Sequence, residues 1–130
     1  MKLAINIENI TKTYPGVLAN SKVSIKVNSG DIHAIVGENG AGKSTLMKIL
    51  YGMVKPDSGN IEIFEKKANM SSPKDAINLG IGMVHQHFML AKNLTVLENI
   101  ILGIDKHFLK NIKLSKYKTE IQKVMELYSL

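Results

Sequence analysis

The first part of the chain alternates apolar and polar residues in the way of half-buried strands. The alternation runs from Leu3 to Ile10 and again from Val23 to Val27, and a period of two places the apolar side chains on one face of a sheet. The turn-forming residues Tyr14-Pro15-Gly16 lie between the two runs. The pattern predicts two half-exposed strands that pair antiparallel.

Two further segments are almost wholly apolar. Ile32 to Val36 follows the turn Ser29-Gly30-Asp31, and Ile81 to Val84 comes later in the chain. A short apolar run bounded by turn residues is typical of a strand buried on both faces, so we expect two buried strands. Another strand, alternating from Ile61 to Phe64, is expected after the turn Pro56-Asp57-Ser58-Gly59.

Four segments carry helix signals. Apolar residues recur at helical spacing after Lys43 and predict a helix over 43–51, and residues 94–102 are also expected to be helical. Ser72 and Pro73 supply the N-cap and first residue of a short helix. The last predicted helix has an apolar face made of Tyr117, Ile121, Val124, Met125 and Tyr128. Such a face needs a partner surface.

The composition bounds the class of protein. The chain has 130 residues, about one domain, with an ordinary apolar share of 45% and no cysteine. Its first residues alternate and do not form the apolar stretch of a signal peptide, and no run approaches the roughly 18 apolar residues that span a bilayer. We therefore expect a cytoplasmic protein that reaches a membrane through a partner.

The charge of the chain does not indicate a nucleic-acid partner. The formal net charge is +6, but all 17 basic residues are lysine. Arginine, which is absent, supplies the planar fork that reads guanine and grips phosphates at two points, whereas lysine is a hydrated point charge. We expect a solvated basic surface and no nucleic acid.

A glycine-rich phosphate-binding loop lies between a predicted strand and a predicted helix. Its residues are Gly37, Glu38, Asn39, Gly40, Ala41, Gly42, Lys43 and Ser44. In this motif the backbone N–H groups surround phosphate oxygens at the positive end of the following helix. We expect Lys43 to reach the outer phosphates of ATP, the Ser44 hydroxyl to coordinate Mg²⁺, and Thr45 to add a donor.

The chain resembles the ATP-binding subunits of ABC transporters in three features: this loop followed by Thr45, the segment Lys12-Thr13-Tyr14, and Gln86 after the second apolar run. The resemblance implies that Tyr14 stacks on the adenine ring. It also implies that Gln86 contacts Mg²⁺ and the attacking water, so that Lys43 and Gln86 are the residues nearest to catalysis.

A longer run resembles one branch of that family. Residues 80–90, followed by Asn93 to Val96, look like the importers of nucleosides and simple sugars. This likeness implies an ATPase on the inner face of the bacterial cell membrane. Its implied partners are transmembrane permease subunits, a second ATP-binding domain that completes the ATP sandwich, and, indirectly, an extracytoplasmic substrate-binding protein.

Some parts of the family pattern are not found in this sequence. There is no Leu-Ser-Gly-Gly-Gln signature and no apolar strand ending in a magnesium aspartate and a catalytic glutamate. We therefore expect residues 1–130 to be the N-terminal part of an ABC nucleotide-binding domain, truncated before those motifs. Alone, it would bind ATP and hydrolyse it poorly or not at all.

The fold class expected from these features is α/β. It comprises a partial P-loop NTPase core, an N-terminal antiparallel β subdomain and the start of a helical subdomain. Two alternatives stay open: a free-standing small P-loop enzyme such as a kinase, and a non-catalytic nucleotide-binding or regulatory module.

Overall fold

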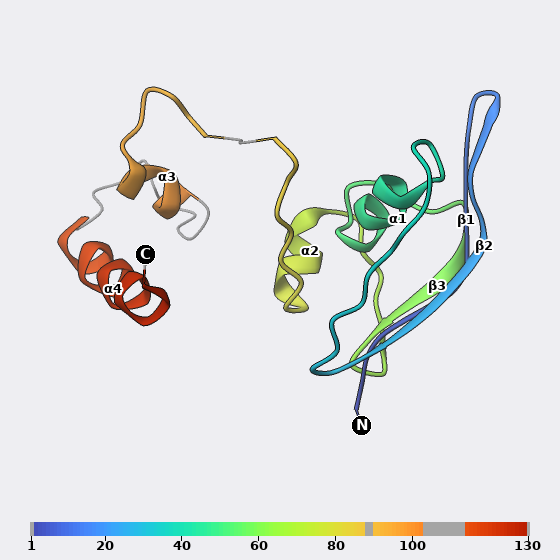
Figure 1. The fold of residues 1–130 in the computed structure, drawn as a ribbon, viewed down its shortest axis with the longest axis horizontal. Helices are drawn as coiled ribbons and strands as arrows, with labels where there is room; N and C mark the ends of the chain where they lie inside the picture. The colour runs from blue at the N-terminus through green and yellow to red at the C-terminus, as the bar shows by residue number, and fades with distance from the viewer. Residues whose placement is uncertain (1, 88–89, 103–113, 130) are drawn as a thin grey trace. The chain divides into compact units, whose positions relative to one another are not determined.

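The computed structural model describes residues 2–87, 90–102 and 114–129. The chain divides into two units, Met1–Val84 and His85–Leu130, which are described separately. Figure 1 shows that the sheet, the phosphate loop and two helices belong to the first unit, and the remaining two helices to the second. Within the described ranges, no helix is long and apolar enough to cross a membrane.

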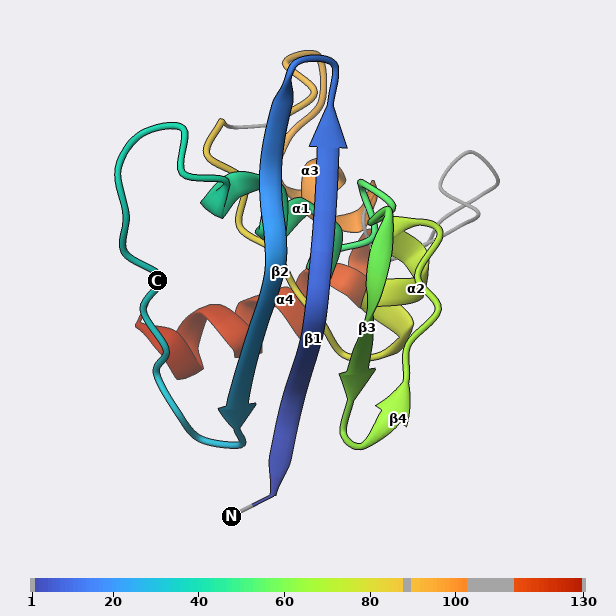
Figure 2. The same cartoon turned by 90° about the vertical axis from the view of Figure 1, so that its right-hand side faces the viewer.

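The first unit contains an antiparallel sheet. Strands β1 (Leu3–Tyr14) and β2 (Val17–Asn28) form a hairpin around a two-residue turn, as the alternating pattern predicted. Strand β3 (Ser58–Ile63) pairs with the other edge of β1, and the short β4 (Lys66–Lys67) pairs with β3. In the described part of the chain the strand order is therefore β2-β1-β3-β4 (Figure 2).

The four predicted helices are confirmed, with small changes at their ends. They are α1 (Lys43–Leu50), α2 (Pro73–Asn78), α3 (Val96–Leu102) and α4 (Leu114–Tyr128). Helix α2 begins as predicted, with Ser72 at the N-cap and proline in the first turn. The apolar side of α4 includes exposed side chains, with Val124 at 53% and Tyr128 at 68% exposed.

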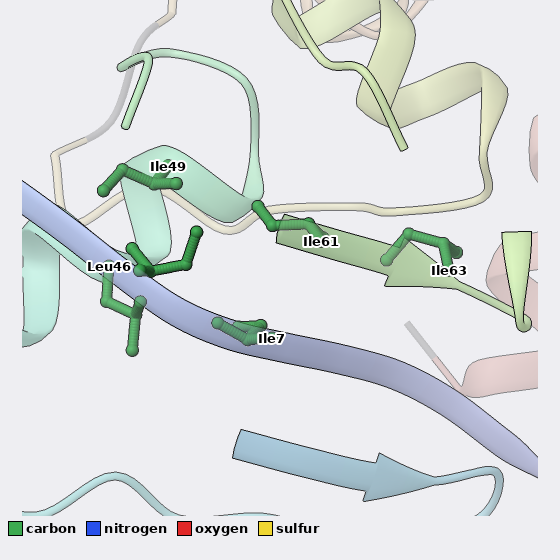
Figure 3. Close-up of a cluster of buried hydrophobic side chains, with 6 residues drawn as sticks. Ile7, Leu46, Ile49, Ile61 and Ile63 are labelled. Atoms are coloured by element: carbon green, nitrogen blue, oxygen red, sulfur yellow. The ribbon is translucent and has the colours of Figure 1, made fainter. Parts of the chain in front are cut away.

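The core of the first unit lies between the sheet and α1. It consists of the buried side chains of Ile7, Ile10, Leu46, Ile49, Ile61 and Ile63. Figure 3 shows Leu46 and Ile49 of α1 in one cluster with the labelled isoleucines of β1 and β3. The period-two pattern turns Ile61 and Ile63 of β3 to one face. In β1 the register is irregular between Ile7 and Ile10, so both of these side chains face the core although they are three residues apart. Burying each isoleucine contributes about 1.5–3 kcal/mol. This packing fixes the start of α1, and thus the phosphate loop, relative to the sheet.

The two predicted buried strands, Ile32 to Val36 and Ile81 to Val84, were wrong. Neither segment is a strand in the structure. Ile32, Val36 and Val84 are 103%, 92% and 98% exposed. Apolarity predicts burial, but a strand also needs hydrogen-bonded neighbours, and among the described residues no strand pairs with either segment. Both segments lie outside the sheet.

Candidate functional site

The phosphate loop connects the irregular segment that ends at Val36 with helix α1. Gly40 and Gly42 have φ of +88° and +80°, in the left-handed region that only glycine adopts freely. Alternation between left- and right-handed backbone turns successive N–H groups toward one side, which forms an anion-binding concavity. The two glycines thus give the loop the left-handed positions that such a concavity uses.

Lys43 is held across this loop by backbone oxygens. Its Nζ donates hydrogen bonds to the carbonyl oxygens of Gly37, at 2.7 Å, and Glu38, at 2.8 Å. An ammonium group has three N–H donors, so two are used and one remains for a phosphate oxygen. The side chain is therefore already positioned at the loop where a negative charge would bind.

The beginning of α1 also favours an anion. Its N-cap is Gly42, which offers no side-chain acceptor, and the first turn contains no acidic residue. The first N–H groups of a helix have no intrahelical partner, and the helix dipole adds partial positive charge there. Ser44 is exposed and Thr45 half-buried in this first turn. Both hydroxyls stand at the helix end that can accept a phosphate with its metal ion.

Strand β2 contacts the loop through Ala19 and Asn20, which the sequence analysis did not single out. The buried Asn20 donates from Nδ2 to the Gly42 carbonyl at 3.0 Å. A Cβ at Gly42 would lie 1.8 Å from the Ala19 carbonyl oxygen, so the two backbones touch directly. Asn20 gave no sequence signal, because its role depends on a residue 22 positions away.

Tyr14 lies at the end of the same hairpin. In the β1–β2 ladder Lys12 faces Asn20, and Tyr14 faces Val17 at the turn. Tyr14 is thus two residues, or roughly 7 Å of strand, beyond the point where the hairpin supports the loop. Its ring is 39% exposed. The structure therefore brings the predicted base-binding tyrosine and the phosphate loop to the same end of one unit.

Asp57 is a second residue near Tyr14 that the sequence analysis read only as part of a turn. Its carboxylate pairs with Lys12 at 2.8 Å and accepts the backbone N–H of Thr13 at 2.7 Å. The hydrogen bond from Lys12, followed by that from Thr13, lowers the pKa of Asp57 below its usual 3.8. Asp57 is therefore a carboxylate anion under ordinary conditions and fixes the end of β1.

Gln86 is exposed and belongs to the second unit, whereas the phosphate loop belongs to the first. Its predicted approach to Ser44 and a magnesium ion stays a prediction. Within the first unit, the β1–β2 hairpin carries Tyr14 and, through Asn20, contacts Gly42 at the start of α1.

Comparison with known proteins identifies the family. The profile of the ABC transporter family matches residues 20–130, which include the whole phosphate loop. The chain belongs to the ABC transporter family. The recognition made from the loop, Tyr14 and Gln86 is thereby confirmed at the level of the family.

Two similar curated proteins are named as import ATP-binding proteins. The chain is 45% identical, over its full length, to the guanosine import ATP-binding protein NupO of Bacillus subtilis (strain 168), of which it covers 26%. It is 48% identical over 126 residues to the nucleoside import ATP-binding protein NupA of Lactococcus lactis subsp. cremoris (strain MG1363), of which it covers 25%. The chain thus spans about a quarter of the length of these relatives.

Solved structures agree with the expected fold class. A nucleotide-free ATP-binding cassette from an ABC transporter matches with a TM-score of 0.80 and 30% identity, over 98% of this chain and 56% of the other. The ADP conformation of another ATP-binding cassette of an ABC transporter matches with a TM-score of 0.72 and 36% identity, over 79% of this chain and 41% of that one. The chain is therefore a partial P-loop NTPase α/β fold with an N-terminal antiparallel sheet.

Proposed function

We propose that this chain holds ATP and Mg²⁺ in an ATPase that powers the import of a nucleoside or simple sugar. The observation that carries the proposal is the joining of the phosphate loop to the Tyr14 hairpin through Asn20 and Gly42. That contact supports the proposal because Tyr14 and the glycine-rich loop then belong to the same end of a single packed unit.

Different residues bind the phosphates and the base of the nucleotide. Loop residues Gly37 to Gly42 surround the phosphates with backbone N–H groups, and Lys43, held by two carbonyl oxygens, donates its remaining N–H to a phosphate oxygen. Tyr14 stacks on the adenine ring, a contact worth about 0.5–1.5 kcal/mol that tolerates any purine. Phosphate contacts therefore dominate the affinity, and the ring adds the preference for a nucleotide over a simple polyphosphate.

The residues at the start of α1 fit a magnesium ion bound with the phosphates. The Ser44 hydroxyl would coordinate Mg²⁺, as hydroxyl and phosphate oxygens are the ligands this ion accepts, and Thr45 lies beside it. Bound there, the ion would neutralise charge on the outer phosphates. Gln86 is proposed as the side chain that orients the attacking water from the second unit.

The transport role is proposed from the relatives. Proteins named as nucleoside and sugar importers match the whole or most of this chain. By analogy, the ATPase would dock on permease subunits at the inner face of the membrane and pair with a second ATP-binding domain. An extracytoplasmic protein would deliver the substrate to the permease, so this chain does not read the substrate.

Thermal denaturation with and without Mg-ATP tests the nucleotide site. A ligand at 100 times its dissociation constant should stabilise the folded site by about 2.7 kcal/mol. Lys43→Ala should lose most of that gain, since it removes the charge that Lys43 presents at the loop. Lys48→Ala, an exposed lysine in the last turn of the same helix, should retain the gain and serves as the matched control.

An equal gain in Lys43→Ala and wild type would contradict the assignment of the phosphate loop. The transport role needs a separate measurement, the uptake of a labelled nucleoside and a labelled monosaccharide by cells that carry Lys43→Ala in the native gene. Loss of one uptake supports the importer. Unchanged uptake of both compounds, with ATP binding intact in the wild type, would favour the non-catalytic module.

A further inference from the structure

Asp57 contacts each of the three residues that precede Tyr14. Its backbone N–H donates to the Thr11 carbonyl at 2.9 Å. One carboxylate oxygen, Oδ1, accepts from Lys12 Nζ at 2.8 Å, and the other, Oδ2, accepts from the Thr13 N–H at 2.7 Å. A single residue in the turn before β3 thus contacts β1 at each position immediately before the aromatic residue.

These bonds continue the sheet where its ladder ends. Strand β3 pairs with β1 only as far as Thr11, which faces Ser58. Beyond this point Thr13 would present its N–H to solvent, and the Asp57 carboxylate takes the place of the missing strand carbonyl. A hydrogen bond to a charged acceptor is stronger than one to a neutral carbonyl. The end of β1 is held although β3 no longer reaches it.

The same carboxylate positions a cation against the aromatic ring. Lys12 and Tyr14 are two residues apart on one strand, so their side chains share a face. Lys12 Nζ lies over the Tyr14 ring, 5.6 Å from its centroid, within the range of a cation–π contact. The Lys12 side chain is only 17% exposed, since it is held by Asp57. One face of the ring is therefore occupied by a restrained ammonium group.

We propose that Asp57 is a positioning residue for Tyr14, acting through Lys12 and the Thr13 backbone so that the ring presents the face opposite Lys12 to the base of the nucleotide. The proposal rests on the ATP-binding function proposed above. Asp57 itself need not touch the ligand, and neither the loop nor Lys43 hydrogen-bonds to it. Its removal should weaken recognition of the base and leave the grip on the phosphates unchanged.

Two ligands separate these effects: Mg-ATP, and inorganic tripolyphosphate with Mg²⁺, which has the phosphates without the base. Calorimetric titration of the native gene product that contains this chain should show Asp57→Ala binding Mg-ATP about threefold to tenfold more weakly. The affinity of Asp57→Ala for tripolyphosphate should stay within about twofold of the wild-type affinity, a difference in binding free energy of less than about half a kcal/mol. Tyr14→Ala should behave in the same way.

A double variant and two single variants make the test specific. Asp57→Ala combined with Tyr14→Ala should bind Mg-ATP no more weakly than Tyr14→Ala alone, because the carboxylate acts through the ring. Asp57→Asn keeps an oxygen for the Thr13 N–H but loses the ion pair, so its loss should be smaller. Asp31→Ala removes a different carboxylate, which caps the turn at Asn28, and should bind both ligands like the wild type.

Several results would overturn the proposal. Equal weakening of both ligands in Asp57→Ala would mean general damage to the site, unchanged Mg-ATP affinity would mean no role, and additive losses in the double variant would mean that Asp57 acts independently of Tyr14. Failure of the wild type to bind Mg-ATP would overturn the proposed function and this inference together. The wild-type titration distinguishes that outcome from the results that overturn only the role of Asp57.

Discussion

At Gly42 an added side chain would meet both an unfavourable backbone conformation and a steric clash. The Gly42 φ of +80° lies in the left-handed region, which costs a residue with a side chain about 1–2 kcal/mol. A Cβ there would also lie 1.8 Å from the Ala19 carbonyl oxygen and 2.9 Å from Asn20 Nδ2. Cβ contacts under 3.0 Å are essentially never observed, so the β2 backbone would have to move by more than an ångström.

We therefore expect Gly42→Ala to destabilise the nucleotide-free protein by about 2–5 kcal/mol, the sum of the backbone cost and a steric cost of about 1–3 kcal/mol. Gly40→Ala is the matched control, because Gly40 lies in the same loop with a φ of +88° but a Cβ there would meet nothing within 4 Å. Its cost should be the backbone part alone, about 1–2 kcal/mol.

Urea unfolding without nucleotide, followed by circular dichroism, gives the two free energies. The difference between the two variants measures the contact of the loop with β2 and should be about 1–3 kcal/mol. Equal free energies of unfolding for Gly42→Ala and Gly40→Ala would refute the claim that the hairpin supports the phosphate loop by direct backbone contact.

Two further predictions concern stability. Ile10→Ala should lower the free energy of unfolding by about 2–5 kcal/mol, because Ile10 is fully buried. Val17→Ala, at a residue 57% exposed, should change that free energy by no more than about 0.5 kcal/mol. Similar losses for the two variants in urea titrations would contradict the assigned core. Hydrogen bonds from Ser71 hold the pKa of Asp75 below its usual 3.8, and hydrogen bonds from Thr95 hold the pKa of Glu98 below its usual 4.5. In acid the unfolded chain therefore binds more protons than the folded chain. The stability that the two carboxylates contribute at higher pH is lost as the pH falls below about 4. Asp75→Asn should flatten that fall in urea midpoints measured between about pH 6 and pH 3, and an unchanged slope would contradict it.

Local sequence signals predicted much of the fold. The alternating runs gave the β1–β2 hairpin, and Ser72 with Pro73 gave the start of α2, because strand alternation and helix capping depend on neighbouring residues. The phosphate loop was equally readable, since its glycine positions follow from the φ values that the loop needs. The structure adds a capping box between Ser72 and Asp75, which the sequence analysis did not name.

The features that the sequence analysis missed or mispredicted depend on contacts between residues far apart in the chain. The run Ile32 to Val36 was read as a buried strand from its apolarity, but strand formation depends on pairing with distant residues, which composition does not encode. Asn20 and Asp57 were missed for the same reason. Asn20 acts on a residue 22 positions away, and Asp57 on residues 44 and 45 positions away.

Hydrogen–deuterium exchange with and without Mg-ATP tests the central claim most directly, because it reports the backbone N–H groups proposed to hold the phosphates. We predict slower exchange on adding Mg-ATP in peptides covering residues 37–45, with a smaller effect around Tyr14, and no slowing in Lys43→Ala. Unchanged exchange across residues 37–45 in the wild type at saturating Mg-ATP would contradict the assignment of this loop as the nucleotide site.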